Sequence, residues 1–169
     1  TSAATVAVAN GAQITTSAPF GLTGTWLIDP QDFTIGGNAT DNISGATLSK
    51  LLVTNSVVIS TATGPDAVVA GTPPVSSLNT ATPGNGDINV NQPVSWTASS
   101  SPTTLTMNAV RDINVNSAIS ATNGNIATCC GRDINVNAAI TTVNGSVLLS
   151  AGHNVNLKAA LTTTDGNIA

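Results

Sequence analysis

RDINVN occupies residues 111–116 and returns unchanged at residues 132–137, after a 21-residue step. Two related copies flank this pair, GDINVN from Gly86 and HNVNLK from His153. The Asp or Asn near the start of each copy lies at position 87, 112, 133 or 154, so the copies follow one another by steps of 25, 21 and 21. Such self-similarity at a fixed period is the sequence signature of a repeat architecture.

A second motif follows the same period. NGNIA begins at Asn123, NGSVL at Asn144 and DGNIA at Asp165. The longer first step between the hexapeptides is explained by four extra residues near positions 99–102, where Ser and Pro indicate a loop. One insertion therefore leaves the 21-residue period intact.

Each repeat contains alternating apolar and polar residues. In the hexapeptide, Ile113 and Val115 alternate with Asn114 and Asn116, which predicts a strand with one buried face. The same pattern predicts a second strand per repeat, and a third short strand precedes the Asn-Gly corner. The residues expected to face inward on these two strands are Leu105, Met107, Ala109, Ile126, Thr128, Cys130, Val147, Leu149 and Ala151, and then Ile119, Ile140 and Leu161.

Two architectures fit strands separated by Asn-Gly corners. Asn-Gly is typical of hairpin turns and would suit an antiparallel meander. A meander has no reason to repeat three different strands at one period, whereas stacked repeats bury the apolar face that a single repeat leaves exposed. We therefore predict an all-β fold, a right-handed parallel β-helix (β-solenoid) with about 21 residues and three short strands per coil.

The composition agrees with stacked coils. The chain has 169 residues, of which 41% are hydrophobic, 2% aromatic and 7% charged. Equivalent residues of stacked coils lie next to their own copies, so charge is costly and Asn, Ser and Thr are favoured. We expect small inward residues at Ala109, Ala139, Ala151 and Ala160.

The charge and hydropathy of the chain exclude several classes. Four Lys and Arg residues and a net charge of −4 are too few and too scattered for a nucleic-acid partner. No apolar run is long enough for a transmembrane helix. The sequence shows no signal peptide, so we expect it to be removed or to lie outside this segment.

The N-terminal half is less regular than the rest. Residues 1–83 are expected to form irregular coils of the same solenoid, and residues 84–169 the regular coils. A strand, an Asn-Gly corner and a second strand are predicted over residues 3–19, a short helix over residues 43–52 and a strand over residues 56–61. Gly and Pro predict a long loop over residues 64–84.

The order of these features resembles a known family. GTWLIDPQDFTI, then ISGATLSKLLVTNSVVIST, then GDINVN and AGHNVNL are similar to the large filamentous-haemagglutinin-like exoproteins of Gram-negative bacteria, adhesins exported by two-partner secretion. The resemblance runs from about Gly24 to Ala169. The WLIDP element is fairly specific to that family, and the DINVN coils much less so.

The resemblance implies a non-catalytic β-helical shaft that is secreted or displayed at the cell surface and supports adhesion. It implies an outer-membrane two-partner secretion transporter and a receptor or glycan on a host or neighbouring cell as partners. The Asn-Pro-Asn motifs of the family's secretion domain are absent, so we expect shaft that follows that domain. The chain stops inside a coil, so we expect further coils beyond Ala169 or identical chains stacked end to end in a fibre.

Asp87, Asp112 and Asp133 form the main candidate site. With nearby Asn oxygens they could hold calcium, which takes about six to eight oxygen ligands. Alternatively, Asp at these positions turns a corner and bonds its own backbone. The last copy reads His153-Asn154, which lowers the negative charge of the row, so we favour the corner and predict no metal.

Cys129 and Cys130 are sequence neighbours with Cα atoms about 3.8 Å apart, closer than the roughly 4.4–6.8 Å of ordinary disulfides. We expect free thiols, with Cys129 facing outward and Cys130 inward, and no base beside either. His153 is expected to be a tolerated corner residue, and no cofactor is predicted.

Two further functions fit the sequence less well. A carbohydrate-binding or polysaccharide-degrading β-helix would need converging carboxylates, and the chain has no Glu; Trp26 and Trp96 could stack on a sugar, but we expect both to be packed. A threonine array that orders water would use residues 141–142 and 162–164, but their counterparts SAT and SWT make it irregular.

Overall fold

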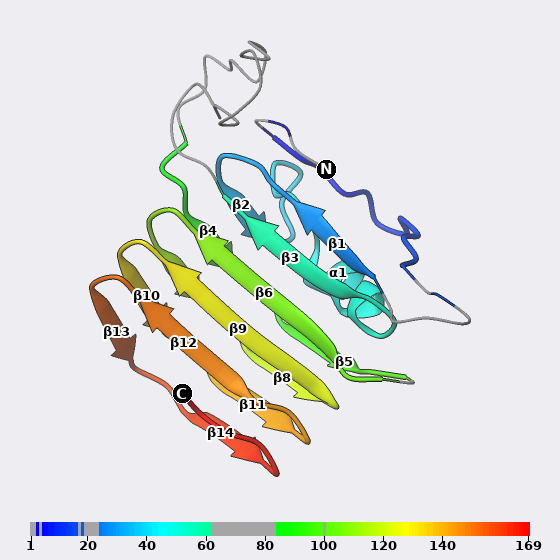
Figure 1. The fold of residues 1–169 in the computed structure, drawn as a ribbon. Helices are drawn as coiled ribbons and strands as arrows, with labels where there is room; N and C mark the ends of the chain where they lie inside the picture. The colour runs from blue at the N-terminus through cyan, green and yellow to red at the C-terminus, as the bar shows by residue number, and fades with distance from the viewer. Residues whose placement is uncertain (1–2, 4, 17, 19–23, 62–83, 100) are drawn as a thin grey trace, which may run out of the picture.

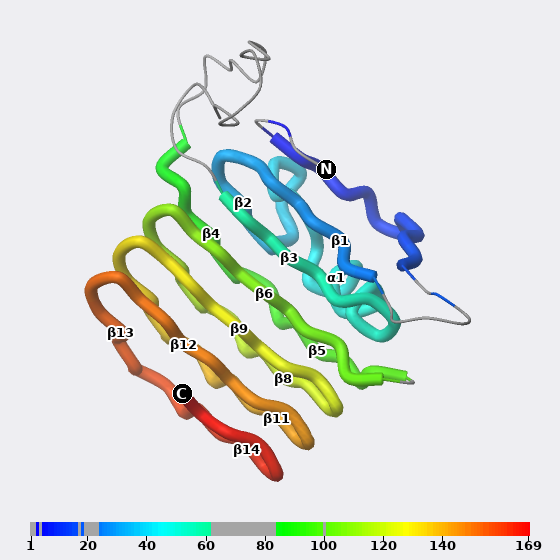
Figure 2. Tube along the Cα trace, in the orientation of Figure 1, coloured from blue at the N-terminus to red at the C-terminus, as the bar shows by residue number. Residues whose placement is uncertain are grey.

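The computed structural model describes residues 3, 5–16, 18, 24–61, 84–99 and 101–169. They form a parallel β-solenoid of about 4 turns spaced about 21 residues apart. The trace winds from one end of the molecule to the other, with successive coils lying side by side (Figure 2). The prediction of an all-β solenoid is confirmed.

Three parallel sheets line the solenoid, and each regular coil contributes one strand to each sheet. The first sheet consists of β1 (Thr25–Ile28), β3 (Ser56–Ser60), β6 (Thr103–Ala109), β9 (Gly124–Cys130) and β12 (Val147–Ala151). The second consists of β2 (Phe33–Ile35), β4 (Ile88–Val90), β7 (Ile113–Val115), β10 (Asp133–Val136) and β13 (Asn154–Leu157). The third consists of β5 (Val94–Thr97), β8 (Ile119–Thr122), β11 (Ile140–Val143) and β14 (Leu161–Thr164).

The winding is right-handed. In Figure 1 the first sheet faces the viewer with its arrows pointing to the upper left, and the chain returns behind it while the coils advance to the lower left. Right-handed connections between parallel strands are expected, because the twist of each strand favours them.

The register follows the sequence repeat. Ile134 pairs with Ile113 on one side and with Val155 on the other, each one repeat away in the sequence. Ile88 pairs with Ile113 across the longer first step, so the insertion at residues 99–102 does not shift the strands. The alignment read from the repeat is therefore the alignment of the sheets.

The core is a continuous column of inward side chains from successive coils. Ile88, Ile113 and Ile134 are fully buried and stack along the second sheet, as do their neighbours two residues later. Burying a side chain of this size stabilises a fold by about 1.5–3 kcal/mol. Repetition of the same layer thus supplies the stability that one coil lacks.

Two of the predicted inward alanines point the other way. Ala139 precedes the buried Ile140, so the alternation of the strand turns it outward, and its counterpart Ala118 in the preceding coil is exposed. Ala160 is exposed as well. The interior at this corner is filled by the larger Ile140 and not by alanine.

The N-terminal part follows the prediction only in places. The predicted helix is α1 (Gly45–Leu52), which begins at the N-cap Ser44, and the predicted strand is β3. Residues 5–16 keep the Asn-Gly turn, with Gly11 at φ +89°, but contain no strand. Isolated hydrogen bonds such as Val8 N–H to Asn42 O hold this segment, and no strand ladder forms. Residues 64–83 of the predicted loop lie outside the described residues.

The N-terminal edges of two sheets are covered. Helix α1 packs on β5, and the N–H of Ser95 donates to Ser49 Oγ at 2.9 Å. Beside β2, Ile35 forms a parallel bridge with Ile43. Covered edges cannot recruit another strand, so these two sheets are protected from stacking at this end. In the described part of the chain, no helix is long and apolar enough to cross a membrane.

The Asn-Gly corners bring successive coils into close backbone contact. Asn123, Asn144 and Asp165 have left-handed φ angles of 52°, 51° and 56°. Each is followed by a glycine, and a Cβ on Gly145 would collide with the carbonyl oxygen of Gly124 in the coil before it. The glycine is thus required by the approach of the neighbouring backbone, while Asn or Asp supplies the left-handed turn.

Gly145→Ala should therefore destabilise the protein. The added methyl group meets backbone that belongs to a paired strand, so we expect a loss of about 1–3 kcal/mol in the free energy of unfolding, as for other overpacked sites. Urea denaturation measures this loss, with the exposed, outward-facing Ser150→Ala as the control. A midpoint for Gly145→Ala equal to that of the control would show that the coils are not in contact at this corner.

Candidate functional site

The candidate acidic row is an ion-pair ladder between coils. Arg111 Nε donates to Asp87 Oδ1 of the preceding coil at 2.7 Å, and its Nη2 pairs with the other carboxylate oxygen. Arg132 binds Asp112 in the same bidentate way, with an Nε–Oδ1 distance of 2.7 Å. Each guanidinium thus reaches back by one coil.

The last member of the ladder uses histidine. His153 Nδ1 lies 3.1 Å from Asp133 Oδ1, at the position where earlier coils place arginine. The imidazole side chain is 70% exposed and the carboxylate 20%. Since His153 is charged only when protonated, this rung depends on pH in a way that the arginine rungs do not.

The same carboxylates also hold the backbone of the next coil. Asp112 N–H donates to Asp87 Oδ1, and Asp133 N–H donates to Asp112 Oδ1, both at 3.2 Å. The row of carboxylates begins one coil earlier than the sequence indicated, at Asp32. Asp32 accepts three backbone N–H groups, from Asn85, Gly86 and Asp87, with its Oδ1 at 3.0, 2.8 and 2.9 Å.

The pKa shifts in the ladder follow these contacts. The hydrogen bond to Asp87 raises the pKa of Arg111, and the hydrogen bond to Asp112 raises the pKa of Arg132. Burial alone would raise the pKa of Asp133, but hydrogen bonds from His153 and Asn154 outweigh it and lower this pKa. The ladder therefore favours the charged forms of these groups.

This geometry gives the acidic row a structural role. Each carboxylate of Asp87, Asp112 and Asp133 faces a basic side chain of the next coil. The described residues contain no group of three or more His, Cys, Asp or Glu that could hold a metal ion. The observed role differs in detail from the predicted corner role. These carboxylates bond the backbone of the next coil and not their own backbone. The left-handed φ angles of a corner occur at Asn123, Asn144 and Asp165 instead.

Asparagines on the outer face of the coils form two further ladders. In each, the Nδ2 group of one coil donates to the Oδ1 atom of the coil before it, with distances from 2.8 to 3.0 Å. The second ladder ends at Lys158, which occupies the next asparagine position. The members are Asn89, Asn114, Asn135 and Asn156 in one ladder and Asn91, Asn116 and Asn137 in the other.

The cysteines and tryptophans lie as expected. Cys129 is exposed and Cys130 buried, both are free thiols, and burial raises the pKa of Cys130. Trp96 is 4% exposed and its Nε1 donates to Thr103 Oγ1 at 2.9 Å, so it cannot stack on a sugar. Trp26 is half-buried and packs against the core.

The outward row of the threonine array is aligned from strand to strand, but fewer threonines face outward than the sequence indicated. Ser95, Ser120, Thr141 and Thr162 form one outward row in neighbouring strands. Thr142 points inward, is fully buried and donates to the carbonyl oxygen of Gly145 at 2.6 Å. Alternate threonines of each run therefore belong to the core and cannot meet a ligand.

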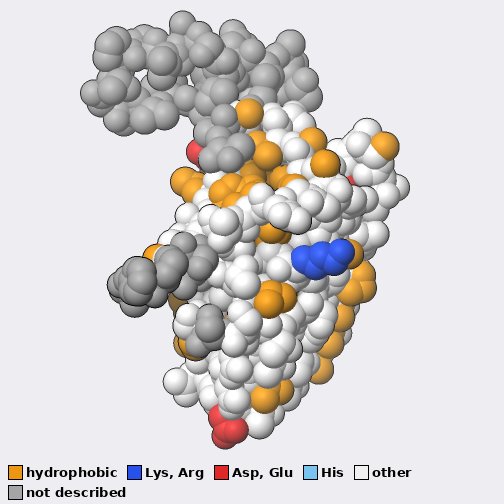
Figure 3. Space-filling view, turned by 90° about the vertical axis from the view of Figure 1, so that its right-hand side faces the viewer, with side chains coloured by type: hydrophobic (Ala, Val, Ile, Leu, Met, Phe, Trp, Pro, Cys, Tyr) orange, Lys and Arg blue, Asp and Glu red, His pale blue; other side chains and the backbone are white. Residues whose placement is uncertain are grey.

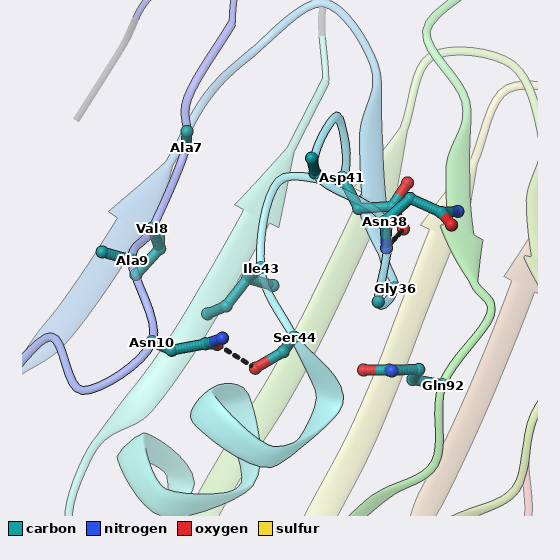
Figure 4. Close-up of a pocket in the computed structure, with 12 residues that line it drawn as sticks. Ala7, Val8, Ala9, Asn10, Gly36, Asn38, Asp41, Ile43, Ser44 and Gln92 are labelled. Atoms are coloured by element: carbon teal, nitrogen blue, oxygen red, sulfur yellow. Dashed lines mark hydrogen bonds between the residues drawn. The ribbon is translucent and has the colours of Figure 1, made fainter.

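A cleft that the sequence did not reveal lies near the N-terminal end. It encloses about 420 Å³ beside α1 and is lined by residues 7–10, 36–39, 41, 43, 44 and 92 (Figure 4). We call it the polar cleft, because Asn10, Asn38, Asp41, Ser44 and Gln92 border it. Its walls come from three segments that are far apart in the sequence, so no local motif could have predicted it.

Comparison with known proteins adds no relative: no family model, no curated protein and no solved structure matches the chain. A function for the chain is therefore inferred from the fold, the ladders and the polar cleft.

The His153 rung predicts a pH effect that can be measured. Because the pKa of Asp133 is lowered on folding, its contribution to stability is present above the unfolded pKa and is lost as the pH falls through the folded value. NMR titration of the side-chain carboxyl carbon should give a pKa for Asp133 below the ordinary value. His153→Ala should raise it, and the control Lys158→Ala should leave it unchanged. An Asp133 pKa that does not respond to His153→Ala would contradict the assigned rung.

Proposed function

We propose that the chain is a structural β-helical shaft segment of a secreted, cell-surface, filamentous-haemagglutinin-like adhesin, and that it has no catalytic role. The observation that carries this proposal is the uninterrupted in-register stacking of coils on all three sheets. The resemblance of the WLIDP element and the following coils to that family supports it from the sequence. A shaft supports adhesion by holding a binding region away from the cell.

The direction of the bonds suits such a shaft. In a parallel solenoid the hydrogen bonds between strands run along the solenoid axis, and each coil adds about 4.8 Å of length. The arginine–aspartate and asparagine ladders run in the same direction. A force along the axis is therefore shared between the sheets and the ladders, and all three ladders are present at the boundaries between β4, β7 and β10.

The outer surface fits an extracellular role for the shaft. Few charged side chains interrupt it, and the view in Figure 3 is dominated by uncharged atoms with small blue and red areas. Under this proposal the chain crosses the outer membrane through a two-partner secretion transporter, and the adhesin that it supports meets a receptor or glycan on a host or neighbouring cell. No nucleic-acid partner is proposed, because the chain carries four basic residues.

The two ends of the solenoid differ in how they meet other coils. At the C-terminal end Val155 and Leu157 are 42% and 54% exposed, although their partners Ile134 and Val136 are fully buried. At the N-terminal end α1 covers β5. Head-to-tail stacking of identical chains is thus disfavoured at the end where α1 lies.

The alternative of a polysaccharide-degrading β-helix has less support. Such an enzyme needs carboxylates that converge in a groove. In the described part of the chain, the carboxylates of Asp87, Asp112 and Asp133 instead follow one another along the axis and each binds a basic side chain. Carboxylates arranged in this way do not favour hydrolysis or elimination of a polysaccharide.

Coil duplication combined with export tests the proposal. The chain is placed between the secretion domain of a two-partner exoprotein and a reporter, in Gram-negative cells that carry the matching transporter. Variants carry no, one or two extra copies of residues 132–152, which make one 21-residue coil. We expect the reporter outside the cell in each case, and a purified rod that lengthens by about 4.8 Å per copy in small-angle scattering.

The control insert has the residues of the same coil in scrambled order and should reduce export and solubility. Retention of the reporter inside the cell with the intact chain would overturn the proposed export. Duplicated coils that leave the rod length unchanged would overturn the shaft.

A further inference from the structure

We propose that the polar cleft binds one neutral sugar residue of a glycan. This goes beyond the shaft role, because a shaft needs no ligand site, and it stands independently of that role. The proposal rests on four features of the cleft: the polar atoms that it leaves free, its weak charge, the glycines that make room for it, and its size.

Two amide side chains of the cleft each use one atom for hydrogen bonds within the protein and leave the other atom free for a ligand. Asn10 Oδ1 accepts from Ser44 Oγ at 2.7 Å and from Thr47 Oγ1 at 3.1 Å. Gln92 Oε1 accepts from the N–H of Gly45 at 3.0 Å. With each amide oxygen occupied, the NH2 groups of Asn10 and Gln92 remain as donors, and no described residue accepts from them.

Asp41 adds an acceptor in the same manner. Its Oδ2 accepts from the N–H of Asn38 at 2.7 Å, while no described residue donates to its Oδ1. The side chain of Asn38 has no hydrogen-bond partner among the described residues and offers both a donor and an acceptor. The cleft thus combines fixed donors with a fixed acceptor around one space (Figure 4).

This mixture suits sugar hydroxyls. A hydroxyl group donates one hydrogen bond and accepts two, so one hydroxyl can donate to Asp41 Oδ1 while it accepts from an amide NH2. Neighbouring ring hydroxyls repeat this pattern at short spacing. Because hydrogen bonds already hold the side chains of Asn10, Gln92 and Asp41, binding does not have to order them, which reduces the entropic cost.

The charges of the cleft exclude two other ligand classes. Asp41 is the one charged residue among those that line the cleft, and no Lys or Arg balances a phosphate, sulfate or uronate there. At the start of α1, the N–H groups of Gly45 and Thr47 are also occupied, by Gln92 Oε1 and Ser44 Oγ, and are not free to bind an anion. A calcium ion would need about six to eight oxygen ligands, far more than one carboxylate provides.

Two adjacent glycines make room for the polar side chains. A Cβ on Gly36 would collide with Asp41 Oδ2, and a Cβ on Gly37 would collide with Gln92 Nε2. The acceptor and one donor of the cleft therefore lie directly over glycine backbone. Larger residues at these positions would displace both.

The size of the cleft sets the size of the ligand. Small-molecule sites commonly enclose about 300–1,000 Å³, and about 420 Å³ places this cleft at the lower end of that range. The partly buried Val8 adds an apolar surface on which the face of a ring can rest. One pyranose ring fills such a space, with the rest of a glycan outside it.

NMR titration of the full chain tests the proposal. Glucose, galactose, mannose and N-acetylglucosamine are added separately, with calcium chloride and glucuronate as competing probes. At least one neutral sugar should shift the amide resonances of residues 36–44 saturably, with a Kd on the order of 1 mM. Asp41→Asn keeps an oxygen for the Asn38 N–H but replaces the free acceptor with a donor, so it should weaken binding about tenfold or more.

Asp165→Asn is the matched control. It removes one carboxylate at the other end of the solenoid, where the equivalent Asn123 and Asn144 already adopt the same left-handed turn, and should bind like the parent protein. Should Asp41→Asn disturb the fold, Asn38→Ala replaces it, because the lost side chain makes no hydrogen bond to the described residues. Shifts with calcium or glucuronate alone, no saturable shift with any neutral sugar, or unchanged binding by the folded Asp41→Asn or Asn38→Ala protein would overturn the proposal.

Discussion

Every side chain in the regular coils must tolerate a copy of its own position about 4.8 Å away. Apolar residues meet this requirement by packing, as Ile88, Ile113 and Ile134 do in the core. Asparagine meets it because its amide carries both a donor and an acceptor, so that Asn135 donates to Asn114 and accepts from Asn156. The low charge of the chain is a consequence of this requirement.

Charged residues satisfy the same constraint in one specific way. Arg and Asp are neighbours in sequence, but the bidentate bond of Arg132 reaches Asp112 in the coil before it. Asp112 is thereby placed between Arg111 and Arg132, and like charges do not meet directly. Because each Arg pairs with the Asp of the preceding coil, the repulsion between like charges stacked in successive coils is offset.

The sequence predicts the parts of the structure that repeat. The 21-residue period and the alternation of Ile113 and Val115 were enough to predict the sheets, their register and the inward Trp96, because stacked coils convert sequence period into spatial contact. The ion pairs were not predicted because Arg111 and Asp87 belong to different repeats, and the adjacent Asp112 makes the longer contact with Arg111. The polar cleft was missed because Asn10, Asp41 and Gln92 belong to irregular segments, where no period relates them.

Disulfide trapping tests the in-register stacking most directly. Ser150 is paired with Cys129 in the neighbouring coil, and Leu148 with Ala127, and all four face outward. In a Cys130→Ala background, Ser150→Cys should form an intramolecular disulfide with Cys129 on mild oxidation, since paired Cα atoms lie within the usual bridging range of about 4.4–6.8 Å. Leu148→Cys should remain reduced. Equal oxidation of both variants, or preferential oxidation of Leu148→Cys, would contradict the 21-residue register on which the whole account depends.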